Sequence, residues 1–519
     1  MSTIDQKIKN SSSARRRVAI IGGGLVGSLS TIYFAKRGWE VLLFELRKDP
    51  RLEDKTSLSQ RSINLALSAR GISALKNAGS NLDEVVLSQV APMKGRMIHR
   101  RKGGLLSQLY GVFGECIYSV DRATLLGLLL DDAEKSENVK IYFEHQLKQC
   151  DFDARVLDVE NKNDGTISKY EADLIVGADG AYSTVRSQLM RVVRMNYQQE
   201  FIPHAYCELT IPPKKNAKGE FEFAMDPNHL HIWPRHTFMM IALPNLDKSF
   251  TCTLFMPYEK FDAIKTEDDL ITFYQLYFTD AIPLIGEQNL KRDYFLNPKG
   301  SLISIKCDPY NYKDRAVIIG DAAHSMVPFY GQGMNCGFQD VEILDKIFEQ
   351  HNINSQKPEI NINTFNTNSA KEQENDDMKF RKDLERALDE YTRYRHIDVT
   401  TICDLAMYNY IEMRSSVISP IYITRKKIEE WLHWLFPSRI IPLYPMVSFT
   451  DMRYSDAQRR WKRQNFLINV IAGSTVLATF AALVLGLRCG RCNIQNVNYK
   501  DSMVSIIKNI YEKISRKIF

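Results

Sequence analysis

Residues 17–47, RVAIIGGGLVGSLSTIYFAKRGWEVLLFELR, decide the fold of this chain. A short apolar run from Val18 to Ile21 leads into three glycines with the spacing G-x-G-x-x-G, and an apolar helical pattern follows. A second apolar run, Val41 to Phe44, then ends at Glu45. A strand, a glycine turn, a helix and a strand in this order predict the dinucleotide-binding unit of a Rossmann-like α/β domain.

Each part of that unit has a physical role in holding a dinucleotide. Gly22 allows a tight turn, Gly24 lets backbone N–H groups approach a pyrophosphate, and Gly27 allows the helix to pack closely on the strand. The helix N-terminus directs partial positive charge at the phosphates, and Glu45 can accept hydrogen bonds from a ribose diol. The alternative is an ordinary glycine-rich turn in another kind of α/β protein.

Length, composition and charge narrow the class of protein. The chain has 519 residues, 44% of them hydrophobic and 25% charged, which suggests two or more domains with sizeable cores. Its nine cysteines show no paired spacing through the body, which suits a reducing compartment. The net charge is +6, but residues 488–519 carry seven basic and two acidic residues, so the body is near neutral. This distribution argues against nucleic acid and for an anionic surface near the C-terminus.

A basic residue stands at the start of a predicted helix that runs from Asp121 to Ala133. Asp121 is expected to cap the helix, and Arg122 falls in its first turn, where its charge opposes the helix dipole. That position is explained if Arg122 faces a phosphate group. The alternative is a solvated arginine on the protein surface.

Two further motifs follow the glycine turn in order. The second motif of the chain is D-G-x-x-S-x-x-R at residues 179–186, and the third is G-D at residues 320–321; each follows a short apolar strand pattern. After the third motif, VPFYGQGMN (327–335) predicts a loop and then a helix that begins near Gly333. We interpret that helix N-terminus as one that closes over the same cofactor.

A segment with a different pattern lies between these two motifs. Residues 201–299 begin with short β runs that predict an antiparallel sheet inserted in the α/β domain. The last run alternates, which predicts one buried face (Phe250, Cys252, Leu254 and Met256) and one outward face (Ser249, Thr251 and Thr253). The α/β domain therefore comprises residues 17–200 and a return segment, 300–351.

The ends of the chain and one insertion carry their own patterns. Residues 1–16 and the asparagine-rich segment 352–377 are predicted to be disordered, and 378–465 to be helical. Residues 466–487 contain no charge, and at about 1.5 Å per residue such a helix spans a bilayer core of roughly 30 Å. The basic tail, 488–519, has apolar residues at helical spacing, which suits an amphipathic helix at a membrane interface.

The three motifs in this order resemble those of the single-component FAD-dependent aromatic hydroxylases. Five longer strings are similar to the branch of that family that hydroxylates L-kynurenine: SINLALSARG (62–71), HLHIWPR (229–235), VPFYGQGMN (327–335), MYNYIEMR (407–414) and IPLYPMVSF (441–449). The resemblance covers nearly the whole chain. One departure is Tyr330, which stands where animal members of that branch commonly have phenylalanine.

The resemblance implies a reaction and a set of site residues. The reaction is the NADPH- and O₂-dependent conversion of L-kynurenine to 3-hydroxykynurenine in tryptophan catabolism, with a flavin C4a-hydroperoxide as the oxygen donor. It implies no catalytic side chain and no metal. The implied substrate-binding residues are Arg96, Tyr110, Phe329, Asn409 and Tyr444. The cofactor-binding residues, from the motifs and the resemblance together, are Gly22, Gly24, Val26, Gly27, Glu45, Arg47, Ala66, Arg122, Leu147, Asp179, Thr184, Asp321, Met334 and Asn335.

The C-terminal pattern and the resemblance also imply a location. We expect a protein of the mitochondrial outer membrane with its catalytic body in the cytosol; the endoplasmic reticulum membrane is the alternative. Two other functions remain open at this point, a different membrane-bound FAD-dependent hydroxylase or epoxidase and a non-enzymatic FAD-binding scaffold. Against the first alternative, Arg96 with Tyr110 and the segment YNYIEMR suit an amino-acid substrate rather than a sterol.

Overall fold

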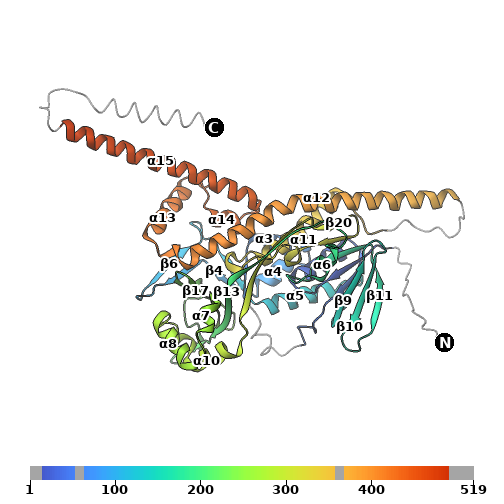
Figure 1. Cartoon of the computed structure of the whole chain (residues 1–519), viewed down its shortest axis with the longest axis horizontal. Helices are drawn as coiled ribbons and strands as arrows, with labels where there is room; N and C mark the ends of the chain where they lie inside the picture. The colour runs from blue at the N-terminus through green and yellow to red at the C-terminus, as the bar shows by residue number, and fades with distance from the viewer. Residues whose placement is uncertain (1–14, 53–63, 357–366, 490–519) are drawn as a thin grey trace. The chain divides into compact units, whose positions relative to one another are not determined.

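The computed structural model describes residues 15–52, 64–356 and 367–489 (Figure 1). The chain divides into two compact units, Met1–Gln458 and Arg459–Phe519, and all of the sheets lie in the first. Most of the lead that was predicted to be disordered, residues 1–14, lies outside the described residues. Arg16 differs from that prediction, because it is buried and forms an ion pair with Asp377 at 2.9 Å.

A six-stranded sheet forms the first layer and confirms the predicted Rossmann-like unit. β1 (Arg17–Ile21), α1 (Leu25–Lys36) and β2 (Glu40–Phe44) follow one another as the sequence predicts. The strand order is β20-β21-β12-β1-β2-β8. The other strands are β8 (Val139–Tyr142), β12 (Leu174–Gly177), β20 (Asn311–Tyr312) and β21 (Ala316–Ile318). All neighbours are parallel except the edge strand β20, so the glycine turn and both later motifs meet at the same edge of the sheet.

Helices predicted beside this sheet are present. α5 (Arg122–Glu134) begins after Asp121, whose carboxylate accepts the Thr124 N–H at 2.7 Å, as expected for the cap. α6 (Thr184–Leu189) follows the second motif, and α11 (Gly333–Gln350) begins where the sequence places it. α3 (Ala69–Ala78) and α4 (Leu82–Leu87) follow the first unit along the chain.

A seven-stranded sheet forms the second layer, and it differs from the predicted insertion in two ways. Its order is β19-β13-β18-β17-β16-β5-β6, so it recruits strands from outside residues 201–299. It is also not purely antiparallel, because β16 and β5 run parallel. Its strands are β5 (Gly95–His99), β6 (Leu105–Leu109), β13 (Asn196–Ile211), β16 (His229–Arg235), β17 (Phe238–Pro244), β18 (Phe250–Pro257) and β19 (Gly300–Asp308).

Both faces of this sheet are covered, which corrects the predicted outward face of β18. Phe250, Cys252 and Leu254 face a core formed with α7 (Tyr258–Asp262), α8 (Glu267–Tyr277), α9 (Ile282–Ile285) and α10 (Glu287–Leu296). Ser249 and Thr253 were predicted to face solvent but are buried. Thr253 lines a cavity on the opposite face, together with Phe255. A period-two pattern reports two faces, but it does not say whether the polar one meets water or a binding site.

Three smaller sheets complete the β structure. β3 (Leu65–Leu67), β7 (Ile117–Val120) and β4 (Ala91–Met93) form one of them. β9 (His145–Asp151), β10 (Val156–Asn161) and β11 (Ile167–Glu171) form another, and β14 (Lys214–Lys215) pairs with β15 (Phe221–Glu222).

The C-terminal region is helical, and α12 is its longest helix in the first unit (Figure 1). α12 (Thr367–Arg414) begins inside the segment that was predicted to be disordered, so that prediction is wrong for residues 367–377; residues 357–366 lie outside the described residues. The later helices are η3 (Ser416–Ile418), α13 (Pro420–Leu435), α14 (Leu443–Ser448) and α15 (Tyr454–Cys489).

The predicted membrane span coincides with part of α15. Within the residues that the structure describes, no helix is both long and apolar enough to cross a bilayer. Several side chains of 466–487 and all of residues 490–519 lie outside the described residues. The predicted amphipathic tail, 488–519, is therefore almost entirely outside them.

Candidate functional site

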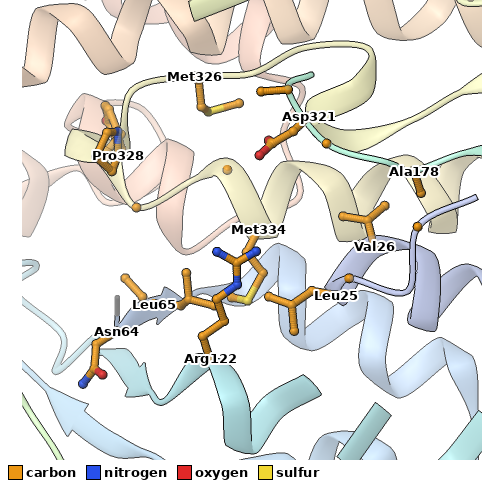
Figure 2. A pocket seen from close by; sticks show the side chains of 18 of the residues that line it. Leu25, Val26, Asn64, Leu65, Arg122, Ala178, Asp321, Met326, Pro328 and Met334 are labelled. Carbon is orange, nitrogen blue, oxygen red and sulfur yellow. The ribbon is translucent and has the colours of Figure 1, made fainter. Parts of the chain in front are cut away.

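A cavity of about 670 Å³ lies between the two large sheets, a size typical of a site for a cofactor or small molecule. Its wall carries residues of all three sequence motifs and of the seven-stranded sheet. Figure 2 shows part of this wall, with Leu25 and Val26 of α1, Arg122 of α5 and Met334 of α11 directed toward a shared space.

The glycine turn presents bare backbone to this cavity. Gly22 has φ +102°, and a Cβ there would lie 2.5 Å from the Ala178 carbonyl oxygen. A Cβ on Gly27 would lie 1.8 Å from the carbonyl oxygen of Gly22, so this position requires close helix–strand packing. A Cβ on Gly24, in contrast, would meet no atom within 4 Å. The space beside Gly24 is therefore a cradle that the protein itself does not fill.

Two helix N-termini open onto the same cavity without side-chain caps. α1 begins after Gly24 and α11 after Gln332, and neither N-cap side chain accepts a hydrogen bond from its helix. Gly24, Val26, Gly333 and Met334 all line the cavity. Uncapped N–H groups at a helix N-terminus attract anions or polarised oxygen atoms. The pair therefore fits a ligand with negative charge at two places, as in the diphosphate and flavin ring of FAD.

Glu45 holds the glycine turn from the adjacent strand. Its two carboxylate oxygens accept the N–H groups of Gly23 at 2.7 Å and Arg47 at 2.9 Å. Glu45 and Arg47 both line the cavity. Since a carboxylate oxygen has more than one lone pair, Glu45 can keep these bonds and still accept a ribose hydroxyl.

Arg122 and Asp321 line the cavity from two different helical elements. Arg122 stands in the first turn of α5 and points toward Met334 in Figure 2, which favours the cavity over the alternative of a solvated surface residue. Desolvation by the surrounding protein raises the pKa of Asp321, while His324 and Arg122 lower it. Other predicted cofactor residues on the wall are Ala66, Leu147, Asp179 and Thr184.

Hydrogen bonds made by the second motif, D-G-x-x-S-x-x-R, support the cavity wall. Asp179 accepts the hydroxyl of Ser183 at 2.5 Å and the N–H of Thr184 at 2.7 Å. Arg186 donates to the carbonyl oxygen of Ala322 at 2.7 Å, directly after Asp321. The second motif therefore positions the third one, and its serine and arginine act behind the wall.

A buried network that sequence reasoning missed holds the third motif from the other side. Asp340 of α11 accepts the Gly320 N–H at 2.9 Å, His324 lies 2.6 Å away, and Arg395 of α12 forms an ion pair at 2.7 Å. Only the fold brings these residues together, since Arg395 lies 55 positions from Asp340.

Part of this network has the composition of a metal site. The donor atoms of His324, Cys336 and Asp340 lie within 4.8 Å of one another. Arg395 also contacts the Cys336 sulfur at 3.2 Å, so the positive charge of a guanidinium already lies beside these three donor atoms. Burial raises the pKa of Cys336, which keeps it a thiol and a poor ligand. The arrangement favours a structural role.

Three predicted site residues do not line the cavity: Gly27, Asn335 and Tyr110. The Asn335 amide accepts the Ser68 N–H at 2.9 Å and donates to the carbonyls of Ala66 at 2.7 Å and Gly331 at 2.8 Å. Its side chain therefore fastens the loop before α11 to β3 and is not directed at a cofactor.

Arg96 lies at the substrate end of the cavity and is buried, with only 4% of it exposed. It forms an ion pair with Glu412 at 2.9 Å and donates to the Asn409 amide oxygen at 3.3 Å. Burial, the largest single effect, acts to lower the pKa of Arg96, but the Glu412 carboxylate together with the surrounding tyrosines raises it overall. The guanidinium therefore remains charged inside the protein.

Stacked aromatic rings surround this guanidinium. Tyr444 lies between Tyr110 and Tyr330, with ring centroids 4.8 Å and 5.5 Å apart and nearly parallel planes. Arg96 lies 4.9 Å from the Tyr444 centroid, within the range of a cation–π contact. Among the described residues, neither the Tyr110 hydroxyl nor the Arg96 Nε has a hydrogen-bond partner. Arg96 lines the cavity, and Tyr110 is stacked directly behind Tyr444, which also lines it.

The cavity between its two ends is apolar. Leu230, Met239, Ile241, Leu243 and Phe255 line it from the seven-stranded sheet. Phe329 also lines it and stacks on Tyr410 at 3.8 Å, and Asn409 donates to the Phe329 carbonyl at 2.7 Å.

Glu412 is the substrate-end residue that sequence reasoning missed. It lies three residues after Asn409 on α12, a spacing that places both side chains on one face of a helix. That spacing in MYNYIEMR was the available signal, because a buried arginine requires a carboxylate partner nearby.

Comparisons with known proteins agree with this site. The FAD binding domain family model matches residues 15–360. Kynurenine 3-monooxygenase of Drosophila willistoni is 46% identical over 88% of this chain and 92% of its own length. The enzyme of that name from Sus scrofa is 42% identical over 93% of this chain and 97% of its own length.

The chain belongs to the kynurenine 3-monooxygenase family. It is thus an FAD-dependent monooxygenase. Among solved structures, 2-methyl-3-hydroxypyridine-5-carboxylic acid oxygenase matches 79% of this chain and 95% of its own with a TM-score of 0.57 at 19% identity. A probable FAD-dependent monooxygenase from Pseudomonas aeruginosa matches 77% of this chain and 97% of its own with a TM-score of 0.54 at 18% identity. At these identities the likeness concerns the fold.

Proposed function

We propose that this protein hydroxylates L-kynurenine to 3-hydroxykynurenine with NADPH and O₂. The observation that carries the proposal is the ion pair of buried Arg96 with half-buried Glu412 at one end of an apolar cavity, which two uncapped helix N-termini also reach. A zwitterionic aromatic amino acid has a carboxylate, an ammonium group and an apolar ring. Arg96 and the apolar residues line the cavity, and Glu412 lies directly behind Arg96. The family membership supports the same substrate.

Arg96 and Tyr110 are suited to bind the substrate carboxylate. The Arg96 Nε and the Tyr110 hydroxyl are both buried donors without a hydrogen-bond partner among the described residues. Burial raises the pKa of Tyr110 well above its usual value, so its hydroxyl keeps its proton and can donate it to a carboxylate. A guanidinium that meets a carboxylate in a defined orientation fixes position as well as charge.

Glu412 is suited to bind the substrate ammonium group. Its carboxylate already lies 2.9 Å from Arg96, so a bound zwitterion would give each member of the pair a second partner of opposite charge. The apolar wall, with Phe329 and Phe255 in T-shaped contact at 4.9 Å, would then surround the ring. An apolar wall also keeps water from the reacting groups.

FAD, when bound, supplies the transfer of oxygen from O₂ at the expense of NADPH. Gly24, Glu45, Arg122 and Asp321 would hold it along the nucleotide end, and the first turn of α11 would lie beside its ring. We assign no residues to NADPH. No side chain of the site is required as a nucleophile.

Product analysis tests this function. The purified chain, reconstituted with FAD, would be incubated with L-kynurenine, NADPH and O₂, and the product identified by mass spectrometry and by comparison with authentic 3-hydroxykynurenine. The expected result is one added oxygen at carbon 3 and substrate-dependent NADPH oxidation. NADPH oxidation that yields hydroxylated product from another aromatic compound but none from L-kynurenine would favour a different hydroxylase. FAD binding without substrate-dependent NADPH oxidation would favour a scaffold.

We also propose that residues 466–487 anchor the chain in the mitochondrial outer membrane, with the catalytic body in the cytosol. The support is the uncharged 22-residue run, with Arg459, Arg460, Lys462 and Arg463 before it and Arg488 and Arg491 after it. The endoplasmic reticulum membrane is the alternative. Alkaline carbonate extraction of purified mitochondria tests the anchor: the full chain should stay in the pellet, and recovery in the supernatant would contradict the proposal.

A further inference from the structure

α13 presents its apolar side chains outward, which is the reverse of an ordinary surface helix. Ile421, Ile428, Trp431 and Leu435 follow one another at spacings of seven, three and four residues, so they form one stripe along the helix. All four are exposed, Ile421 by 82% and Trp431 by 59%. Trp434 and Phe436 extend this apolar stripe at the C-terminal end of the helix and are also exposed.

The opposite face of α13 is polar and packs toward the substrate end of the cavity. Burial raises the pKa of Tyr422, and the Glu412 carboxylate contributes to the same shift. Burial, followed by the Arg96 guanidinium, lowers the pKa of Lys426 to about 8. The helix therefore lies against the Arg96–Glu412 pair with its charged side and leaves its apolar side uncovered in the described structure.

A basic groove adjoins the first turns of α13. It has a volume of about 590 Å³ and is lined by Arg100, Arg101, Lys102, Arg235 and His236 on one side and by Pro420, Ile423 and Thr424 of α13 on the other. Thr424 lies three residues after Ile421 and four before Ile428, so the groove and the apolar stripe are continuous. Groove and stripe together form one surface.

Among the described residues that line the groove, several are basic and none is acidic. Arg235 is 6% exposed, and its guanidinium donates to the carbonyl oxygens of Tyr277 at 2.5 Å, Pro234 at 2.7 Å and His99 at 3.2 Å. Burial, the largest effect, lowers the pKa of Arg235 to about 10, and the nearby Asp280 carboxylate acts in the opposite direction. Asp280 is itself held by His99 and by the Trp233 indole N–H, each at 2.8 Å. With Arg100, Arg101 and Lys102 on the same wall, the groove favours an anion.

We propose that this surface docks on an anionic phospholipid bilayer, with lipid phosphate groups in the basic groove and the apolar stripe of α13 in the interfacial layer. Tryptophans and aliphatic residues on one helix face, with cations beside them, are the composition of interfacial helices. Clustered basic residues add attraction to anionic lipid headgroups. The docking rests on the proposed membrane association but is separate from the anchor, since it involves residues 100–102, 235–236 and 420–436.

The location of the five tryptophans makes the proposal testable in the full chain. Trp39 and Trp233 are completely buried, so lipid cannot reach them, and Trp461 lies just before the proposed anchor. In a Trp461→Phe background, the tryptophans accessible to lipid are Trp431 and Trp434. The protein would be reconstituted in vesicles of phosphatidylcholine and phosphatidylserine whose acyl chains carry bromine near the headgroup, a quencher of tryptophan fluorescence.

The expected result is a loss of about half of the Trp431 and Trp434 emission in brominated vesicles relative to unbrominated ones, as for an interfacial helix. The same chain with Trp431→Phe and Trp434→Phe should show almost no quenching. Flotation of the vesicles separates the two proposals. Protein that does not float overturns the anchor, whereas protein that floats without quenching overturns the docking of α13.

The groove is tested with the combined change Arg100→Gln, Arg101→Gln and Lys102→Gln. Because each basic residue near an anionic surface strengthens binding by roughly fivefold, the change should reduce quenching in phosphatidylserine vesicles to the level seen in pure phosphatidylcholine. The matched control is Lys214→Gln, Lys215→Gln and Lys218→Gln, which removes the same charge from the β14–β15 hairpin and should leave quenching unchanged. Equal quenching of the groove variant and the control would overturn the assignment of lipid phosphate to the groove.

Discussion

The two ends of the cavity are built by different means. At the nucleotide end, backbone carries most of the site, in a glycine turn and two helix N-termini within short stretches of chain. At the substrate end, side chains carry it: Arg96 comes from β5, Glu412 from α12 and Tyr444 from α14. A backbone site leaves a local signature in the sequence, whereas a side-chain site of this kind depends on long-range packing.

The largest effect is expected at the backbone end, from Gly27→Ala. The new Cβ would lie 1.8 Å from the carbonyl oxygen of Gly22, and neither backbone segment can move independently. Overpacking of this kind costs about 1–3 kcal/mol or more, so we expect a lower melting temperature and no retained FAD. Thermal unfolding and the flavin absorbance at about 450 nm measure the two effects. Gly24→Ala is the matched control, because it should leave the melting temperature of the apoprotein unchanged and weaken FAD binding alone. Normal FAD content in Gly27→Ala would contradict the view that backbone packing builds the nucleotide end.

The next effect is expected at the side-chain end, from Arg96→Ala. Loss of one partner of a buried ion pair costs about 2–5 kcal/mol, so kcat/KM for L-kynurenine should fall by roughly thirtyfold to several thousandfold. FAD content should stay normal, because Arg96 belongs to the substrate end of the cavity and not to the nucleotide end. Arg96→Lys should recover only part, since an ammonium group cannot reproduce the planar fork of donors. A kcat/KM of Arg96→Ala within about threefold of wild type would place the clamp elsewhere.

Glu412→Gln should have a smaller effect, mainly on KM. The Glu412 carboxylate now lies 2.9 Å from the Arg96 guanidinium, and the amide oxygen of glutamine can still accept that hydrogen bond. The amide has no negative charge to attract an ammonium group. Because a hydrogen bond to a charged group contributes about 1.5–3 kcal/mol, KM for L-kynurenine should rise roughly tenfold to a hundredfold with kcat less affected. Steady-state kinetics measure this split. An unchanged KM would show that Glu412 acts only as the partner of Arg96.

Glu208, a neighbour of Arg122, tests the protein behind the nucleotide end through the pH dependence of stability. It lies on β13 with Arg122 nearby, and burial raises its pKa to about 7 from 4.5. Below about pH 4.5 both the folded and unfolded states hold this proton; as the pH rises toward 7 only the folded state keeps it, and stability is lost. Glu208→Gln should therefore raise the melting temperature at pH 8, by a free energy of at most about 3 kcal/mol, and have little effect at pH 4. A gain that does not depend on pH would mean that the carboxyl does not titrate in this range.

The smallest effect is expected from Tyr330→Phe. The phenyl ring keeps the stack on Tyr444 at 5.5 Å, and Tyr330 differs from phenylalanine only by its hydroxyl. Since the stacking depends on the ring, kcat/KM should stay within about twofold of wild type, measured under the same conditions as for Arg96→Ala. A larger loss would assign a role at the substrate end to the Tyr330 hydroxyl.

The sequence by itself determined the nucleotide end. G-x-G-x-x-G between a strand and a helix, with Glu45 at the end of the next strand, is a local pattern, because each residue acts through backbone conformation within a few positions. The helix that begins near Gly333 and the cap at Asp121 followed from local rules of the same kind. The resemblance to the kynurenine 3-monooxygenases extended the prediction to Arg96 and Asn409, both of which lie at the cavity.

Only the tertiary structure decided which side chains face each other across the chain. Glu412 pairs with a residue 316 positions away, and Asp340 joins Gly320 to Arg395 inside the protein. Thr253 was predicted to face solvent, but the second face of its sheet covers the cavity. The physical reason is that periodicity and local motifs report the conformation of a segment, whereas burial and ion pairing depend on which distant segment packs against it.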